Sequence, residues 1–214
     1  MSAPRACVVG IVGGVGSGKS ALAKWVKEHL HAAVLDADAA GHRALELAEV
    51  KERIREQFGP DVFDEAGRVI RGRLAERVFG PAEPQRAARR QLEQIVHPVI
   101  RHDLEQQLEV AGQTHDLVVL DAAVALESGW SNVCDAIVFV DVPEDVRQER
   151  VQRTRNWSPE ELTERESSQM SLDDKRSAAE VIIDNSGSLE EAGRQFEDWY
   201  RTWRRTRTSR GTKN

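Results

Sequence analysis

Residues 13–20, GGVGSGKS, have the types and spacing of a loop that binds phosphate. Gly13, Gly18, Lys19 and Ser20 satisfy the spacing G-x-x-x-x-G-K-[ST], in which glycines let several backbone N–H groups turn inward around one phosphate. The lysine adds a positive charge that reaches the β- and γ-phosphates, and the serine hydroxyl can ligate a bridging Mg²⁺. The loop therefore predicts binding of ATP with Mg²⁺, but it does not identify the acceptor of the phosphate.

An apolar run, Ala6–Val12, precedes the loop, and a stretch with helical apolar spacing, Ala21–Leu30, follows it. This strand–loop–helix context is the one in which the motif binds a nucleotide. A GTPase would also need a base-reading N-K-x-D stretch, which the sequence lacks, so a small-molecule kinase is favoured. We expect these residues to bind the nucleotide phosphates, with Ser20 also as the metal ligand: Gly14, Val15, Gly16, Ser17, Gly18, Lys19 and Ser20.

Two acids, Asp36 and Asp38, follow a second apolar run. Residues two apart on an extended segment project to the same side, so these carboxylates would share one face. One would be the base or orienter for an acceptor hydroxyl, and the other would help to position Mg²⁺ or its waters. Alternatively, one of them caps a helix that begins near Ala40, because Asp is a preferred N-cap residue.

Three further basic residues are candidates for the site. His97 and Pro98 lie between two helical stretches, with the proline at the start of the second, and a lone histidine there is more often structural than chemical. Arg150 and Arg153 would lie on one helical face, where guanidinium groups can neutralise charge on a transferring phosphoryl group. The alternative for this pair is a solvated charged face.

The elements that must position these residues indicate an α/β fold. Five short apolar runs are the predicted strands: Ala6–Val12, Ala33–Asp36, Leu117–Asp121, Ile137–Asp141 and Val181–Asp184. Helical stretches alternate with them, which is typical of a parallel sheet covered on both faces, with ligands at the carboxyl ends of the strands. Every run except the first ends in an aspartate, so these acids should lie on the ligand side.

We expect a single domain over residues 1–214 with two insertions. The block after the second strand is mostly helical and too long for a plain crossover, so residues of about 40–113 are predicted to form a substrate-binding lobe. The charged segment of about 150–170 is predicted to be a lid. Residues 204–214 form a basic tail.

Composition excludes several classes of function. The net charge of −6 and the aromatic content of 5% argue against nucleic-acid binding, and no 18 apolar residues run together to cross a membrane. Cys7 and Cys134 lie in or beside apolar runs and are expected to be free thiols. We therefore expect a cytoplasmic protein without nucleic-acid or membrane partners, as a monomer or a weak homo-oligomer.

The order of these motifs resembles the dephospho-CoA kinase family over nearly the whole chain. The matching segments are GGVGSGKS at 13–20, LDAD at 35–38, RGRLAERVF at 71–79, LEQIVHP at 92–98, ALESG at 125–129, PEDVRQERVQR at 143–153 and SQMSLDDKRSAAEVIIDNSG at 168–187. The resemblance implies a three-layer P-loop fold with a five-stranded parallel sheet. It also implies the activity, which is ATP- and Mg²⁺-dependent phosphorylation of the ribose 3′-hydroxyl of dephospho-CoA to give coenzyme A.

The resemblance also implies roles for individual residues. Asp38 would be the catalytic base that faces the ribose hydroxyl, and Arg150 and Arg153 would belong to the lid over the phosphates. Lys19 and Arg150 would neutralise charge during transfer, and Asn185 would lie near the adenine. The residues assigned to the acceptor substrate are Asp36, Arg71, His97 and Glu127.

Two alternatives remain open on the sequence. One is a kinase for another nucleotide-like metabolite. The other is a nucleotide-binding regulatory protein with weakened catalysis, because the stretch 123–126 has Ala-Val-Ala-Leu where the family usually has P-L-L. In addition, Arg147 stands where the family often has Gln.

Overall fold

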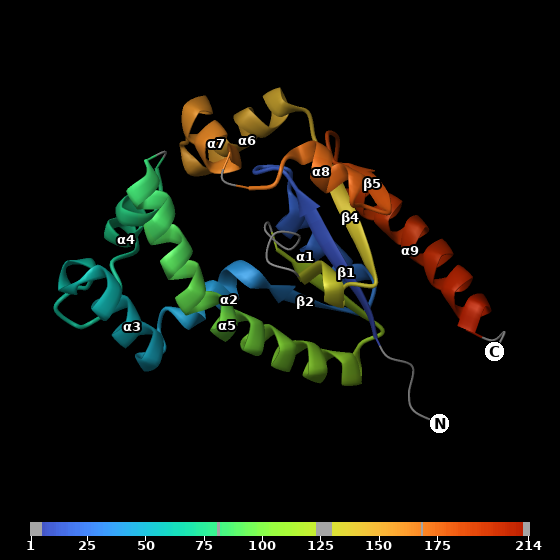
Figure 1. Ribbon diagram of the computed structural model, residues 1–214. Helices are drawn as coiled ribbons and strands as arrows, with labels where there is room; N and C mark the ends of the chain where they lie inside the picture. The colour runs from blue at the N-terminus through green and yellow to red at the C-terminus, as the bar shows by residue number, and fades with distance from the viewer. Residues whose placement is uncertain (1–5, 81, 123–129, 168, 212–214) are drawn as a thin grey trace. The chain divides into compact units, whose positions relative to one another are not determined.

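The computed structural model describes residues 6–80, 82–122, 130–167 and 169–211 (Figure 1). The chain divides into two compact units, which are described separately. The first, Met1–Leu35 with Val110–Asn214, is called the sheet unit, and the second, Asp36–Glu109, is called the helical unit.

The sheet unit is built on five parallel strands in the order β2-β3-β1-β4-β5. Their bounds are β1 Cys7–Gly13, β2 Ala32–Asp36, β3 Leu117–Asp121, β4 Ala136–Asp141 and β5 Val181–Asp184. All five predicted strands and the α/β class are confirmed, with ends that differ by one residue at most. The order places β1 at the centre, so the loop that follows it lies between the carboxyl ends of β3 and β4.

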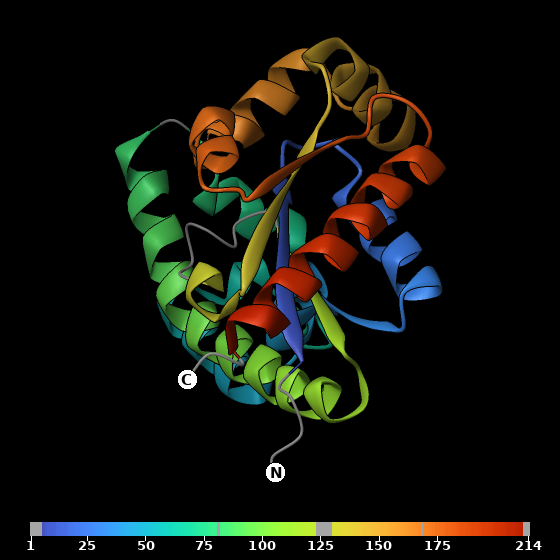
Figure 2. The ribbon, with the colours of Figure 1, turned by 90° about the vertical axis from the view of Figure 1, so that its right-hand side faces the viewer.

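Among the described residues, seven helices belong wholly or partly to the sheet unit. They are α1 Lys19–His29, the last part of α5 Glu83–Thr114, η2 Trp130–Val133, α6 Glu144–Arg155, α7 Pro159–Ser167, α8 Leu172–Ser177 and α9 Leu189–Gly211. Helix α9 packs against α1 and runs beside β5, as Figure 2 shows. A Cβ on Gly193 would lie 2.3 Å from the Trp25 ring, so the glycine permits this close packing.

The apolar core of the sheet unit joins the strands to these two helices. Val9 and Ile11 of β1 are fully buried with Leu22 of α1 and Phe196 of α9. Strand β1 is buried on both faces, so its residues form a continuous apolar run, and this run made the strand easy to predict from the sequence. The core therefore fixes the strand from which the glycine loop emerges.

The helical unit has a separate apolar core. Its elements are α2 Ala37–Ala44, α3 Ala48–Phe58, η1 Pro60–Val62, α4 Arg71–Val78 and the first part of α5. Val50, Ile54, Leu74 and Ile95 are buried together between α3, α4 and α5. These residues recur at helical spacing, so burial of one face of each helix stabilises the unit.

The region around Pro98 differs from the prediction. Two helices were expected on either side of it, but α5 continues through Pro98 as one helix of 32 residues. Proline removes one backbone donor and crowds the preceding turn. The helix continues because Ile95 before the proline and Leu104 after it are both buried. Within the described ranges, no helix is long and apolar enough to cross a membrane.

Candidate active site

The glycine loop connects β1 to α1 and has the backbone of a phosphate-binding turn. Gly16 and Gly18 have φ values of 78° and 87°, in the left-handed region that favours glycine, and Gly18 caps the start of α1. A Cβ on Gly18 would also lie 2.4 Å from Nδ2 of Asn185. Conformation and space therefore both require glycine at position 18.

Lys19 folds back over the loop. Its Nζ donates hydrogen bonds to the carbonyl oxygens of Gly13 at 3.1 Å and Gly14 at 2.8 Å. The positive charge is thus held beside the loop rather than in solvent. This is the position from which an ammonium group can neutralise a phosphate bound to the loop N–H groups.

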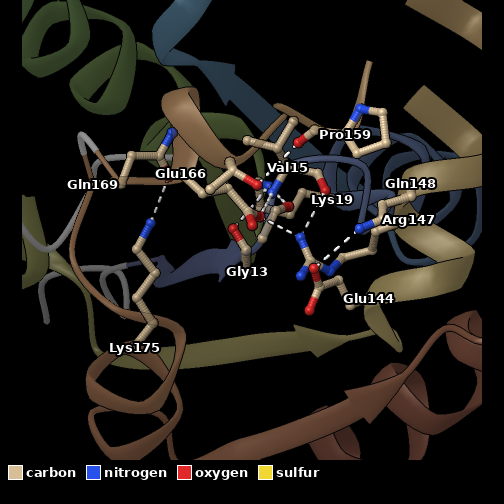
Figure 3. A network of polar contacts seen from close by, with 12 residues as sticks. Gly13, Val15, Lys19, Glu144, Arg147, Gln148, Pro159, Glu166, Gln169 and Lys175 are labelled. Atoms are coloured by element: carbon tan, nitrogen blue, oxygen red, sulfur yellow. Dashed lines mark hydrogen bonds and ion pairs between the residues drawn. The ribbon is translucent and has the colours of Figure 1, made fainter. Parts of the chain in front are cut away.

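Helices α6 and α7 contact the loop directly (Figure 3), and the predicted lid of about 150–170 contains α7 but only the second half of α6. Glu166 Oε1 on α7 accepts hydrogen bonds from the Val15 N–H at 3.0 Å and from Nη1 of Arg147 on α6. The same Nη1 lies 3.3 Å from the Val15 carbonyl oxygen, which it also donates to. An anionic oxygen is therefore already bound to one of the inward-facing N–H groups of the loop.

Asn185 and Arg150 also contact each other and the loop. The Asn185 side chain is buried, and its Nδ2 donates to the Ser17 carbonyl oxygen at 2.7 Å. Arg150 is half-buried, and its Nη2 donates to the Asn185 carbonyl oxygen at 2.8 Å. The structure thus brings Asn185 and Arg150 together with the loop, whereas Arg153 is exposed in the last turn of α6. These contacts give Asn185 a supporting role in addition to the predicted place near the adenine.

The strand-end acids of the sheet unit are in three different environments. Asp141 pairs with Arg176 at 2.7 Å. Asp184 is exposed, and hydrogen bonds from Ser186 lower its pKa. Asp121 is buried at the end of β3, directly beside β1, where it aligns with Ile11. Asp121 and Asp141 therefore end the two strands that flank β1, and the position of each after an apolar run was the signal for it in the sequence.

The Asp36–Asp38 prediction needs a correction. Helix α2 begins at Ala37, so the two acids do not share one face of an extended segment. Asp36 is the N-cap residue, and its Oδ1 accepts a hydrogen bond from the Ala39 N–H at 2.9 Å, so the capping alternative is confirmed. Asp38 is exposed in the first turn, where the helix dipole favours a negative charge. Because Asp36 caps it, α2 begins at Ala37, three residues before the expected start near Ala40.

A hollow of about 300 Å³ lies within the helical unit. Its walls are formed by His42, Arg43, Leu45, Glu46, Val69 and Arg71. Arg71 was predicted from the sequence, whereas His42 and Arg43 were missed. The sequence signal for His42 was its spacing from Asp38: residues four apart on a helix lie on the same face, and both belong to α2.

Two further predicted acceptor residues, His97 and Glu127, are not among the described residues that line this hollow. His97 is exposed on α5 and does not line the hollow. Glu127 lies outside the described residues, as does the unusual stretch 123–126. Helices α2 and α5 are joined beside the hollow by an ion pair of 2.6 Å between Arg43 and Asp103, which orients the Arg43 guanidinium.

Comparisons with known proteins agree with these features. The family model described as dephospho-CoA kinase matches residues 7–191. A dephospho-CoA kinase from Corynebacterium diphtheriae is 37% identical over 199 residues, which cover 91% of this chain and 96% of that protein. A protein of known crystal structure from Thermus thermophilus has a TM-score of 0.79 and 31% identity, covering 93% of this chain and 98% of its own. A solved dephospho-CoA kinase from Campylobacter jejuni, at 20% identity and a TM-score of 0.59, covers 89% of this chain and 96% of its own, and shares the fold.

Proposed function

The chain belongs to the dephospho-CoA kinase family, and from this premise we propose that it transfers the γ-phosphoryl group of ATP to the ribose 3′-hydroxyl of dephospho-CoA. The product is coenzyme A. The observation that carries this proposal is a phosphate-binding loop, with its lysine folded over it, in a chain that matches the family over most of its length.

The loop residues fit a nucleotide phosphate. The Val15 N–H already donates to a carboxylate oxygen, which supports anion binding by this loop. The loop from Gly14 to Ser20 would hold the phosphates of ATP at the start of α1, with the Lys19 ammonium beside them. Arg150 would add a second positive charge, because its guanidinium lies next to Asn185 and the loop.

Oxygen ligands for Mg²⁺ are present on the same side of the sheet. We assign the Ser20 hydroxyl as the protein ligand, and Asp121 at the end of β3 is a further oxygen donor for the metal or its waters. Among the described residues, no three His, Cys, Asp or Glu side chains form a metal-binding group. That fits a Mg²⁺ that keeps several waters and is bound largely through the nucleotide phosphates. When bound, the ion neutralises charge on those phosphates.

Transfer itself requires positioning more than covalent chemistry, because the transition state of phosphoryl transfer is loose. In this proposal Asp38 accepts the proton of the ribose hydroxyl, and Lys19 and Arg150 neutralise charge on the transferring group. Helices α6 and α7 cover the loop and exclude water, which would otherwise compete for the phosphoryl group. Arg153 is assigned to the nucleotide as well.

The hollow of the helical unit fits the other end of the acceptor. Arg43 and Arg71 present guanidinium groups suited to the diphosphate of dephospho-CoA. Leu45 and Val69 supply apolar surface for the pantetheine chain. Asp36, His97 and Glu127 remain predicted acceptor residues, and the cytoplasm and a monomeric or weakly oligomeric state remain predictions from the sequence.

An acceptor panel tests the function. Purified protein with Mg-ATP is offered dephospho-CoA, adenosine, AMP or pantetheine at equal concentrations, and ADP release is followed. Only dephospho-CoA should support rapid release. Release with another acceptor alone would contradict the assigned substrate, and ATP binding without release in any mixture would support the regulatory alternative.

A further inference from the structure

One oxygen of Glu166 is bound to a backbone N–H of the glycine loop. Its Oε1 receives two donors, the Val15 N–H at 3.0 Å and Nη1 of Arg147, as Figure 3 shows. Backbone N–H groups of such loops and arginine guanidinium groups both donate hydrogen bonds to phosphate oxygens. The carboxylate and a phosphate oxygen would therefore compete for the same two donors.

The burial of Arg147 shows that its charge needs an anion. Only 4% of its side chain is exposed, compared with 22% for Glu166. Its Nε, moreover, has no hydrogen-bond partner among the described residues. A buried guanidinium without a counter-charge is strongly unfavourable, so Arg147 must be paired with an anion in every state of the site. Glu166 is that anion in this structure.

The loop is shaped around Arg147. A Cβ on Gly14 would lie 2.8 Å from Nη1 of Arg147, and a Cβ on Gly16 would lie 3.0 Å from its carbonyl oxygen. Both glycines thus let α6 approach the loop closely enough to place the guanidinium beside the Val15 N–H. A phosphate oxygen bound to this N–H would lie within hydrogen-bonding distance of the same Nη1.

Glu166 is held at this place by its own surroundings on α7. The Gln169 N–H donates to the Glu166 carbonyl oxygen at 2.9 Å, and the fully buried Lys175 donates from Nζ to Gln169 Oε1 at 2.8 Å. At the other end of α7, Ser158 and Glu161 form a reciprocal capping pair. These contacts anchor the backbone of α7, and none of them involves the Glu166 carboxylate.

We propose that Arg147 is a nucleotide phosphate-binding residue and that Glu166 is its exchangeable counter-ion, which phosphate displaces from the Val15 N–H. This inference rests on the nucleotide binding of the proposed function. It adds an arginine to the phosphate site beyond Lys19 and Arg150. The free energy of nucleotide binding is then the free energy gained from the phosphate contacts minus the free energy needed to release Glu166.

Calorimetric titration with Mg-ATP and with adenosine tests this exchange. For Glu166→Gln, which removes the competing charge, we expect the Kd for Mg-ATP to fall about tenfold, the size of one charge-assisted hydrogen bond, with adenosine binding unchanged. For Arg147→Gln we expect the Kd for Mg-ATP to rise by at least about tenfold. Glu164→Gln, exposed on the same helix, is the matched control for charge and should leave both affinities unchanged.

A purely structural ion pair predicts a different pattern. Glu166→Gln would then weaken Mg-ATP binding or leave it unchanged, and this would overturn the inference. If Glu166→Gln does not fold, Glu166→Asp is the alternative variant, which keeps the charge. Its shorter side chain brings the carboxylate less close to the Val15 N–H, so Glu166→Asp should also lower the Kd for Mg-ATP. If Arg147→Gln does not fold, Arg147→Lys keeps the charge but loses the planar fork, and it should weaken binding.

The outcome is separable from that of the proposed function. A wild-type chain that binds Mg-ATP but phosphorylates no dephospho-CoA would contradict the proposed acceptor, and the affinity comparison would still decide the role of Arg147. A chain that phosphorylates dephospho-CoA, with Glu166→Gln and wild type equal in Mg-ATP affinity, would overturn this inference alone.

Discussion

The glycine loop of the sheet unit and the hollow of the helical unit are organised in different ways. At the loop, Lys19, Val15, Asn185 and Arg150 all make hydrogen bonds within the chain. In the helical unit, Arg43 is paired with Asp103, but Arg71 and Asp38 are exposed to solvent. The comparison indicates that the loop backbone and Lys19 are arranged before ligands bind, with Glu166 as the group to be released, whereas the proposed acceptor side depends on the substrate for its final contacts.

The largest effect expected from this comparison is at Asp38. Asp38→Asn keeps the shape of the side chain but removes the proton acceptor, so kcat should fall by about 10² to 10⁴. The Kd for Mg-ATP should stay the same, because Asp38 is not part of the loop. Steady-state kinetics and calorimetry measure the two quantities, and an unchanged kcat would remove Asp38 from the role of base.

At the loop, Gly18→Ala should change the backbone conformation that holds the nucleotide phosphates in the proposed function. The new Cβ would lie 2.4 Å from the Asn185 amide in a left-handed backbone, and strain of this kind should weaken Mg-ATP binding by about 10- to 100-fold. Gly72→Ala is the matched control, because a Cβ there meets nothing within 4 Å and Gly72 is helical. That control should bind Mg-ATP normally and be slightly more stable. Equal affinities of the two variants would show that the loop tolerates a side chain.

A smaller effect is expected at the hollow. Arg71→Ala should raise the KM for dephospho-CoA by about tenfold, the size of one charged hydrogen bond, with little change in the KM for ATP. Arg73→Ala removes an exposed arginine of the same helix whose Nη1 donates to the Asp61 carbonyl oxygen, so it should leave both constants unchanged. A rise in the KM for ATP alone would place Arg71 on the donor side.

The smallest effect concerns stability at high pH, which should fall in the sheet unit. Burial raises the pKa of the Cys134 thiol to about 11, above that of an unfolded cysteine. The thiol is neutral when protonated, so its contribution is complete below the unfolded pKa and is lost as the pH rises through about 11. Urea unfolding between pH 8 and 10.5 should show a steeper loss of stability for wild type than for Cys134→Ser. Parallel pH profiles would contradict the burial argument.

The sequence predicted what depends on local pattern. Each strand is a short apolar run, and the loop motif specifies its own backbone, so both could be identified before the structure was known. The start of α2 was expected too late, near Ala40, because a single capping hydrogen bond from the Ala39 N–H to Asp36 decides that the helix begins at Ala37.

The remaining features depend on contacts between distant residues. The continuity of α5 through Pro98 is determined by burial on both sides, which a local rule for proline cannot include. The contact of Glu166 with Val15 joins residues 151 positions apart. No spacing in the sequence indicates it, because both the loop and α7 must fold before it can form.

The most direct test of the central claim is the mass of the product. Purified protein is incubated with Mg-ATP and dephospho-CoA, and ADP release and the product mass are followed together, with Lys19→Ala as the control. We expect one product heavier by a single phosphoryl group, formed in step with ADP by the wild type and lost in Lys19→Ala. ADP release without that product, or equal product from Lys19→Ala, would contradict it.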